Sequence, residues 1–323
     1  MTAVVPGLPF TSPNLLAPME GVTDPLFREI VTALHGEDAL GGTFTEFVRV
    51  VDRPVPTERL RATLGARAHE RPVGLQIMGN RDEALAATTE NAFEAGAPIV
   101  DVNFGCPSRN ALKGCAGSAL LDDPSAVERI VRAVSRAAGD RPTSAKIRAG
   151  GDDDRLLEDL ARAVEAGGAS LLTIHCRTRR EAYADTADWR RLERAVASVS
   201  IPVCGNGGVD RHEDLELVRV RTGVRFAMIG RAALADPWVF SGATVDRARA
   251  ARFLVEYFDG LVARGASEKA AAGRVKQLLR TWTAGGLADE RRTEWLREND
   301  PSVLAEELRT IAVGAPHAAR VGC

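Results

Sequence analysis

Eight short apolar segments recur along the chain up to about residue 242, and this repetition limits the fold more than any other feature. Each is bounded by Gly, Pro or Asn, and segments with helical patterning, such as residues 124–138, lie between them. Strands that alternate with helices pair in parallel through right-handed crossovers, and eight such units close into a (β/α)8 TIM barrel. We expect strands near residues 14–17, 43–46, 73–78, 99–103, 143–148, 170–175, 201–204 and 225–229.

The segment that follows the repeat shows only helical patterns. Apolar Phe253, Tyr257 and Leu261 recur at the spacing of one helix face. This pattern predicts a small helical bundle of about 70 residues. We therefore expect two domains, a barrel over residues 1–242 and a helical domain over residues 243–323, with helices near residues 248–264, 268–284, 291–298 and 302–313.

Charge and cysteine usage narrow the class of protein. The 42 Lys and Arg against 44 Asp and Glu give a net charge of −2, so a nucleic acid must be met by a local patch. No apolar run reaches the ~18 residues that cross a bilayer, and the N-terminus lacks a secretory signal. The cysteines show neither zinc spacing nor a disulfide framework. We expect a cytoplasmic protein without a membrane partner or metal site, its cysteines being Cys106, Cys115, Cys176, Cys204 and Cys323.

Polar residues gather where the expected strands end. In a barrel of this kind the active site lies at the carboxyl ends of the strands. The sequence therefore predicts that many polar groups converge on one rim, namely Pro18, Met19, Glu20, Gln76, Asn103, Cys106, Lys146, Arg148, His175, Arg177, Asn206, Gly207, Gly208, Gly230 and Arg231.

Glycines follow the seventh and eighth strands. The loops after these two strands commonly bind phosphate in this fold. Gly207, Gly208 and Gly230 let backbone N–H groups approach an anion closely, and Arg231 adds positive charge. Each loop alone could contain turn glycines only. Together they predict a cofactor that carries a phosphate.

Lys146 is one of only four lysines and falls in the middle of a strand. A charge at such a position must face a polar site or find a partner. Lys146 could hold electron density on a bound ring, or pair with a structural carboxylate. The same logic applies to Gln76, although a satisfied buried amide is common.

Cys106 lies in a Gly-Cys-Pro sequence directly after a strand. A free thiol has a reference pKa near ~8.5 and so carries a transferable proton at pH 7. The alternative is a small buried side chain, as most free cysteines are. Cys115, on a glycine-rich loop, is a competitor. His175 and Arg177 could contact a cofactor or a nucleic-acid phosphate, or be structural and solvated residues.

Three cations of the helical segment lie on adjacent turns. Arg274, Lys276 and Arg280 could form a stripe that faces an RNA backbone. A solvated helix face explains the same pattern.

Taken in order, these motifs resemble the tRNA-dihydrouridine synthases over about residues 13–240. The resemblance is carried by segments 17–24, 103–108, 146–148, 175–178, 206–208 and 230–231, together with Gln76. Segments 45–52 and 275–279 resemble the bacterial subfamily that modifies position 16 of the D-loop. Gly208 departs from the family, which usually has an acidic residue there; the departure concerns a hydrogen bond to the cofactor's ribityl chain.

The resemblance implies an FMN enzyme that NADPH reduces. Hydride would pass from flavin N5 to C6 of a uracil, and Cys106 would protonate C5. Pro18, Met19 and Glu20 would lie at the flavin ring, with Gln76 and Lys146 at its polar edge and His175 in contact. The phosphate end would be held by Asn206, Gly207, Gly208, Gly230 and Arg231. We expect tRNA contacts from Asn103, Arg148, Arg177, Arg274, Lys276 and Arg280, and a monomer.

Two other functions remain open from the sequence. The first is an FMN oxidoreductase that acts on a free pyrimidine, like the dihydroorotate dehydrogenases, although such an enzyme does not need the helical tail. The second is a tRNA-binding barrel without catalysis. Reduction of C5=C6 needs a hydride and a proton donor around one base, and a uridine inside folded tRNA must first be extruded. A rim of polar groups followed by a second domain suits that task.

Overall fold

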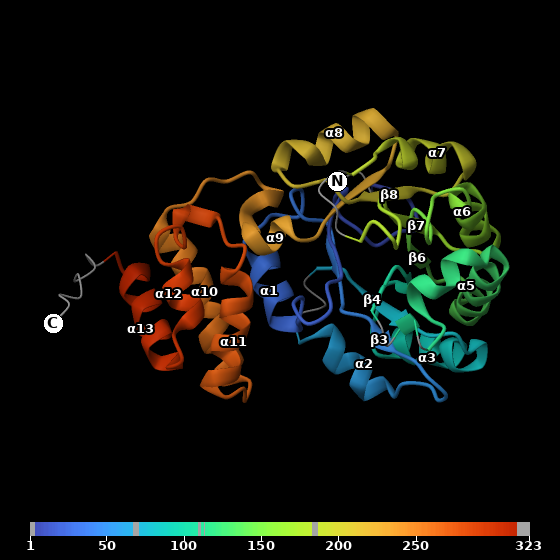
Figure 1. Cartoon of the computed structure of the whole chain (residues 1–323). Helices are drawn as coiled ribbons and strands as arrows, with labels where there is room; N and C mark the ends of the chain where they lie inside the picture. The colour runs from blue at the N-terminus through green and yellow to red at the C-terminus, as the bar shows by residue number, and fades with distance from the viewer. Residues whose placement is uncertain (1–3, 67–70, 109–110, 113, 183–186, 315–323) are drawn as a thin grey trace. The chain divides into compact units, whose positions relative to one another are not determined.

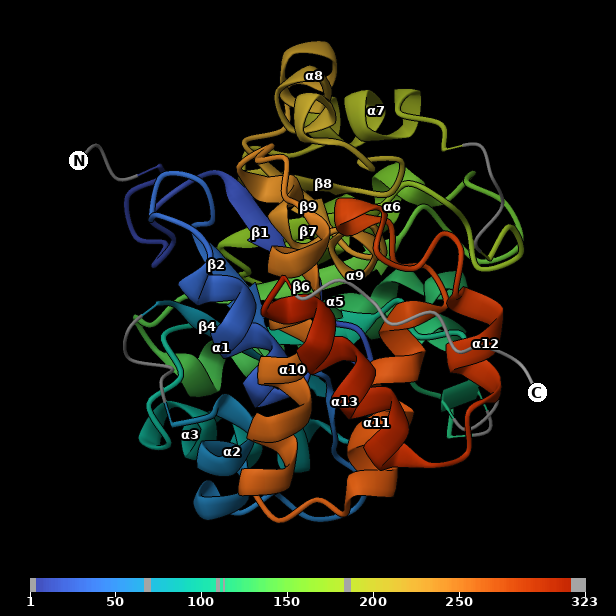
Figure 2. The same cartoon turned by 90° about the vertical axis from the view of Figure 1, so that its left-hand side faces the viewer.

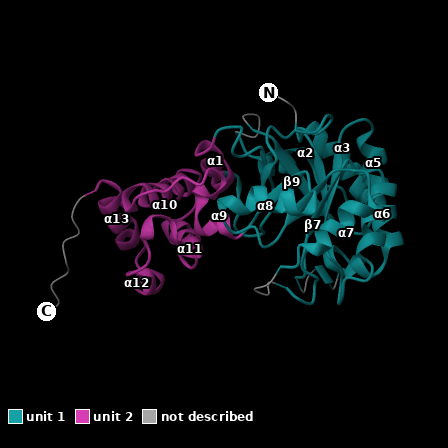
Figure 3. Ribbon diagram, turned by 90° about the horizontal axis from the view of Figure 1, so that it is seen from above, with its two compact units in different colours: residues 1–25, 36–230 teal, residues 26–35, 231–323 magenta. Residues whose placement is uncertain are grey.

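A computed structural model describes residues 4–66, 71–108, 111–112, 114–182 and 187–314. The chain forms two compact units, coloured separately in Figure 3. The first contains residues 1–25 and 36–230, and the second contains residues 26–35 and 231–323. The expected boundary after residue 242 thus lies inside the second unit, which also includes a helix from the start of the chain.

The first unit is a closed barrel of eight parallel strands (Figure 1), which confirms the predicted fold. Each strand pairs in parallel with the next, and pairings of β1 with β9 and of β2 with β4 complete the ring. A short extra strand, β3 (Val48–Arg49), pairs with β4. The barrel strands are β1 (Asn14–Leu16), β2 (Gly42–Phe44), β4 (Val73–Met78), β5 (Val100–Phe104), β6 (Thr143–Arg148), β7 (Leu171–His175), β8 (Val203–Asn206) and β9 (Phe226–Ile229).

Helices connect the strands and pack on one another in chain order around the barrel. Local sequence fixes their ends. In α5, Asp123 accepts a hydrogen bond from the Ala126 N–H, Pro124 fills the first helical position, and Gly139 ends the helix with φ 63°. The helical elements are α2 (Thr57–Leu64), α3 (Asp82–Glu94), η1 (Gly117–Asp122), α5 (Pro124–Ala138), α6 (Leu157–Ala166), α7 (Arg190–Ser198) and α8 (His212–Thr222).

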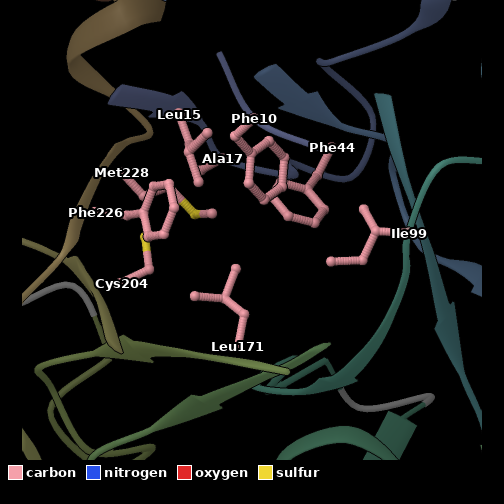
Figure 4. Close-up of a cluster of buried hydrophobic side chains, with 9 residues drawn as sticks. All are labelled: Phe10, Leu15, Ala17, Phe44, Ile99, Leu171, Cys204, Phe226 and Met228. Atoms are coloured by element: carbon pink, nitrogen blue, oxygen red, sulfur yellow. The ribbon is translucent and has the colours of Figure 1, made fainter. Parts of the chain in front are cut away.

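An apolar cluster fills part of the barrel interior (Figure 4). The Phe10 ring lies 5.6 Å from Phe44 and 5.7 Å from Phe226, so the aromatic side chains pack edge-on or tilted. Leu15 and Leu171 belong to the same cluster and are fully buried. Further along the strands the buried side chains become polar, and this change marks where the site begins.

The second unit is helical, as the sequence predicts. Its core is aromatic: Phe253 packs against Phe27, Trp238 and Trp282, with ring centroids 5.4–6.0 Å apart. Helices α10, α11 and α13 pack side by side (Figure 2). The helical elements are α1 (Pro25–Ala33), α9 (Ala232–Ala235), η2 (Pro237–Phe240), α10 (Arg247–Ala263), α11 (Glu268–Leu279), η3 (Ala284–Gly286), α12 (Arg292–Arg297) and α13 (Pro301–Ala312). No helix in the described ranges is both long and apolar enough to span a bilayer.

Candidate active site

Strand register brings the predicted polar residues to one end of the barrel. Asn103 of β5 pairs with Lys146 of β6, and Arg148 at the end of β6 pairs with His175 of β7. His175 in turn pairs with Asn206 of β8. Paired residues on neighbouring strands point to the same face of a sheet. These five residues therefore define what we call the barrel mouth.

A buried chain of hydrogen bonds runs across β4 and β5. Gln76 Nε2 donates to Asp101 Oδ2 at 2.6 Å, and Asn103 Nδ2 donates to Gln76 Oε1 at 2.7 Å. Asn103 Oδ1 accepts the backbone N–H groups of Gly105 and Cys106, both at 2.9 Å. The side-chain oxygen and nitrogen of Gln76, and those of Asn103, thus each form a hydrogen bond with another protein group. Sequence reasoning missed Asp101, whose only signal was a carboxylate within an apolar strand.

Cys106 is half-buried on the turn that Asn103 supports. Its thiol donates to Ser108 Oγ at 3.3 Å, and its carbonyl accepts the Ser118 hydroxyl at 2.9 Å. Gly117 has φ 60°, and a Cβ there would lie 2.9 Å from the Cys106 carbonyl oxygen. The turn therefore has a fixed position. Cys115 is exposed, with φ 47°. The four described cysteines are free thiols, and Cys323 lies outside the described residues.

Lys146 and Asp101, two buried residues of opposite charge, interact electrostatically at this end of the barrel. Burial and then the charge of Arg148 lower the pKa of Lys146 to about 8. Burial raises the pKa of Asp101 to about 6, against hydrogen bonds from Ser144 and Gln76 and the charge of Lys146. No described carboxylate lies within ion-pair distance of the Lys146 ammonium. Lys146 is therefore a cation available to a bound anion at neutral pH.

Arg148 is buried and holds two loops together. Its Nε donates to the Gly105 carbonyl at 2.8 Å, and its Nη1 donates to the Ala182 carbonyl at 3.0 Å. Nη1 also lies 3.5 Å from His175 Nδ1. Burial, together with the charges of Lys146 and Arg148, lowers the pKa of His175 to about 2. His175 is therefore neutral, and Arg148 contributes to the turn that carries Cys106.

Gly207 and Gly208, which follow β8, lie where a larger residue would crowd its neighbours. Gly207 has φ 98°, and a Cβ there would lie 3.0 Å from Cys176 Sγ and 3.3 Å from His175 Nε2. Gly208 has φ 69°, and a Cβ there would lie 2.6 Å from Ala187 Cβ, so this fold does not accommodate a side chain at this position. Asn206 Nδ2 donates to the Met228 carbonyl at 2.9 Å.

The loop after β1 turns tightly beside Gly230, which follows β9. The Met19 N–H donates to Thr23 Oγ1 at 2.9 Å. A Cβ at Gly230 would lie 3.6 Å from both Ala17 Cβ and Met19 Sδ. Pro18 and Met19 are half-buried and Glu20 is exposed. The first and last strands of the barrel thus bring their loops together.

The predicted cations outside the barrel mouth have different surroundings. Arg177 is buried, whereas Arg231, which begins the C-terminal segment of the second unit, is exposed. Arg274 Nε donates to Tyr257 Oη at 3.3 Å, and Lys276 donates to the Glu298 carbonyl. Arg280 is exposed. The three helical cations therefore do not form one uniform solvated stripe. Among the described side chains, no cluster of His, Cys, Asp or Glu could hold a metal ion.

Arg179 is a second residue whose structural role the sequence did not show. It donates to the Ser118 carbonyl at 2.9 Å and forms ion pairs with Asp122 and Asp152 at 3.1 and 2.9 Å. Ser118 in turn donates to the Cys106 carbonyl. Arg179 thus connects the loops that follow β5, β6 and β7. The sequence shows only a run of charges there, which is equally typical of a solvated loop.

A closed parallel barrel with a thiol, a cation and close-packed glycines at its carboxyl ends is built as a barrel enzyme. The family model for dihydrouridine synthases matches residues 15–278. The chain belongs to the dihydrouridine synthase family, as the resemblance implies.

Curated relatives agree with this family assignment. The tRNA-dihydrouridine(16) synthase of Haemophilus influenzae is 37% identical over 231 residues, covering 69% of this chain and 74% of that protein. The tRNA-dihydrouridine synthase B of Pseudomonas aeruginosa is 37% identical over 235 residues, covering 72% and 69%. A probable tRNA-dihydrouridine synthase of Rhodobacter capsulatus is 28% identical over 322 residues, covering 96% and 98%.

Substituting Gly207 with alanine tests the close approach at the glycine loop. We expect Gly207→Ala to reduce flavin bound at purification, because its Cβ would crowd Cys176 and His175 and φ 98° is strained for alanine. The matched control is Gly96→Ala, which has φ 102° but no atom within 4 Å of the new Cβ. Visible absorbance per protein measures the flavin. Equal loss in both variants would assign the effect to backbone strain alone.

Proposed function

We propose that this protein reduces a uridine of the tRNA D-loop, at position 16, to 5,6-dihydrouridine, with FMN as cofactor and NADPH as reductant. Family membership supports tRNA uridine reduction. Position 16 is supported by the names of relatives such as the Haemophilus influenzae protein. The observation that carries the proposal is the Cys106 thiol, which Asn103 holds on a fixed turn at the same end of the barrel as Lys146.

The residues at the barrel mouth fit an anionic flavin cofactor. Lys146 offers a positive charge to the reduced ring, and neutral His175 adds no charge of its own. Gly207, Gly208 and Gly230 lie in the loops after the last two strands, which commonly bind phosphate in this fold. Asn206 and Arg231 would also hold the phosphate end of the cofactor. The flavin ring would be held by Pro18, Met19, Glu20 and Gln76. FMN, when reduced by NADPH, supplies a hydride.

Cys106 completes the reduction by protonation. Saturation of C5=C6 adds a hydride at C6 and a proton at C5. The Cys106 thiol gives its proton to C5, and the resulting thiolate regains a proton from solvent. Ser108 Oγ, 3.3 Å from Sγ, orients the thiol. The bonds from Asn103 and Ser118 to the backbone of Cys106 hold the donor in place, so that little motion is needed at the moment of transfer.

The tRNA must present an extruded base to this mouth. We assign tRNA contacts at the mouth to Asn103, Arg148 and Arg177, and further contacts to the helical domain over residues 243–323 through Arg274, Lys276 and Arg280. Of the helical cations, exposed Arg280 is the most accessible to a phosphate. The catalytic domain is assigned to residues 1–242, and the protein acts as a cytoplasmic monomer.

Mapping dihydrouridine in tRNA from cells that lack the gene tests this function. We expect position 16 to remain uridine in those cells and to become dihydrouridine again when the wild-type gene is restored. The gene carrying Cys106→Ala should not restore it. Loss of dihydrouridine at another position would reassign the target, and an unchanged pattern would refute the function.

A further inference from the structure

Four buried side chains of β4, β5 and β6 form an unbroken relay that ends at the turn of Cys106. Ser144 Oγ donates to Asp101 Oδ1 at 2.6 Å, and Gln76 Nε2 donates to Asp101 Oδ2 at 2.6 Å. Asn103 then donates to Gln76 Oε1. Asn103 Oδ1 is left to accept the N–H of Cys106. Asp101 is 1% exposed and Gln76 fully buried, so water does not compete for these bonds.

The direction of every bond in this relay follows from Asp101. An ionised carboxylate only accepts hydrogen bonds, whereas a primary amide has one accepting and one donating end. Asp101 therefore requires Gln76 to turn its NH2 inward and its oxygen toward Asn103. That oxygen requires the Asn103 NH2, which leaves the Asn103 oxygen for the backbone N–H groups of Gly105 and Cys106. Reversal of either amide would set two donors or two acceptors against each other.

We propose that Asp101 is a positioning residue, whose carboxylate sets the direction of the relay and thereby holds the Cys106 turn in its reactive place. Asp101 acts only through Gln76 and Asn103. Its consequence for catalysis rests on the proposed function, whereas its consequence for stability does not.

Asn103→Asp breaks the relay with almost no change in shape. The new carboxylate at position 103 still accepts the backbone N–H groups, but its other oxygen meets Gln76 Oε1. If the Gln76 amide turns round, its oxygen meets Asp101 instead. While both carboxylates are ionised, one pair of acceptors is therefore always opposed. An unsatisfied buried group of this kind lowers kcat roughly tenfold or more and the unfolding temperature by roughly 2–8 °C.

Asp101→Asn combined with Asn103→Asp reverses the relay and satisfies it again. The new amide at position 101 donates to Gln76 Oε1 and accepts from Ser144, and Gln76 Nε2 donates to the new carboxylate. We expect the double variant to recover the unfolding temperature and to bring kcat within about fivefold of wild type. The single Asp101→Asn variant should lose less than Asn103→Asp, because Ser144 Oγ can accept from the new amide.

Asn91→Asp serves as the control for unspecific stabilisation by Asp101→Asn. Asn91 Nδ2 donates to the Val55 carbonyl, so its substitution also breaks a hydrogen bond, but one that the relay does not share. Asp101→Asn should not rescue Asn91→Asp.

Each result of this cycle decides the proposal. Recovery of both the unfolding temperature and kcat in the double variant supports it. Recovery of the temperature without kcat overturns the positioning role, and so does a double variant that shows only the sum of the two single losses. If wild-type protein forms no dihydrouridine, the proposed function fails, while recovery of the unfolding temperature still tests the relay by itself.

Discussion

Cys106→Ala lowers kcat for dihydrouridine formation by about 10²–10⁴-fold, the range that a positioned general acid contributes. Its flavin content and the rate at which NADPH reduces the flavin stay close to wild type, because among the described residues the Cys106 side chain makes one hydrogen bond, to Ser108 Oγ. The backbone bonds to Asn103 and Ser118 remain. Stopped-flow absorbance separates the two half-reactions, and nucleoside mass spectrometry measures the product.

Cys115→Ser is the matched control for Cys106→Ala. Cys115 is exposed in the loop region that follows β5, and Cys106 is part of that region too. The Cys115 thiol is not part of the hydrogen-bond relay of Ser144, Asp101, Gln76 and Asn103. We expect this variant to retain activity within about threefold, as a surface substitution does. The reverse pattern, with Cys115→Ser inactive and Cys106→Ala active, would move the proton donor to Cys115.

Lys146→Met lowers the reduction potential of the bound flavin and reduces kcat by about 10²-fold, the effect of losing one preorganised charge in a buried site. Methionine retains the length of the side chain, so the loss isolates the charge. Anaerobic reductive titration measures the potential, and steady-state kinetics give kcat. Lys269→Met, which removes an exposed lysine of α11, should change neither quantity.

The pH dependence of the wild-type enzyme follows from the same lysine. Burial lowers the pKa of Lys146 to about 8, so its positive charge is present at pH 7 and is lost as pH rises through about 8. We therefore expect kcat to fall on the alkaline side near pH 8. Lys146→Met should lack this decline. An alkaline decline that persists in the variant would assign it to another group.

The barrel architecture was predictable because each barrel strand has a local sequence signal, a short segment bounded by Gly, Pro or Asn. Residues 73–78 and 143–148 are strands in the structure with the expected bounds. The active site of such a barrel lies at the carboxyl ends of its strands. Asn103, Lys146 and His175 could therefore be placed at the barrel mouth from the sequence alone, and the strand register agrees. Periodicity and strand order carry that information.

Hydrogen-bond partners and domain membership could not be predicted in the same way. Sequence alternation places Asp101 and Asn103 on one side of β5, but it does not show that Gln76 joins them across the sheet. Nor does it show that α1 belongs to the second unit, where Phe27 packs against Phe253 and Tyr257. Such pairings depend on residues far apart in the chain, and only the folded structure brings them together.

The measurement that tests the account most directly is dihydrouridine formed per reduced flavin in a single anaerobic turnover. Purified protein loaded with FMN is reduced by NADPH and mixed with an unmodified tRNA transcript. The account predicts one dihydrouridine per flavin, located at position 16, and none in a transcript with cytidine there. A protein that takes up no FMN, or that keeps its reduced flavin while the tRNA stays unmodified, would contradict it.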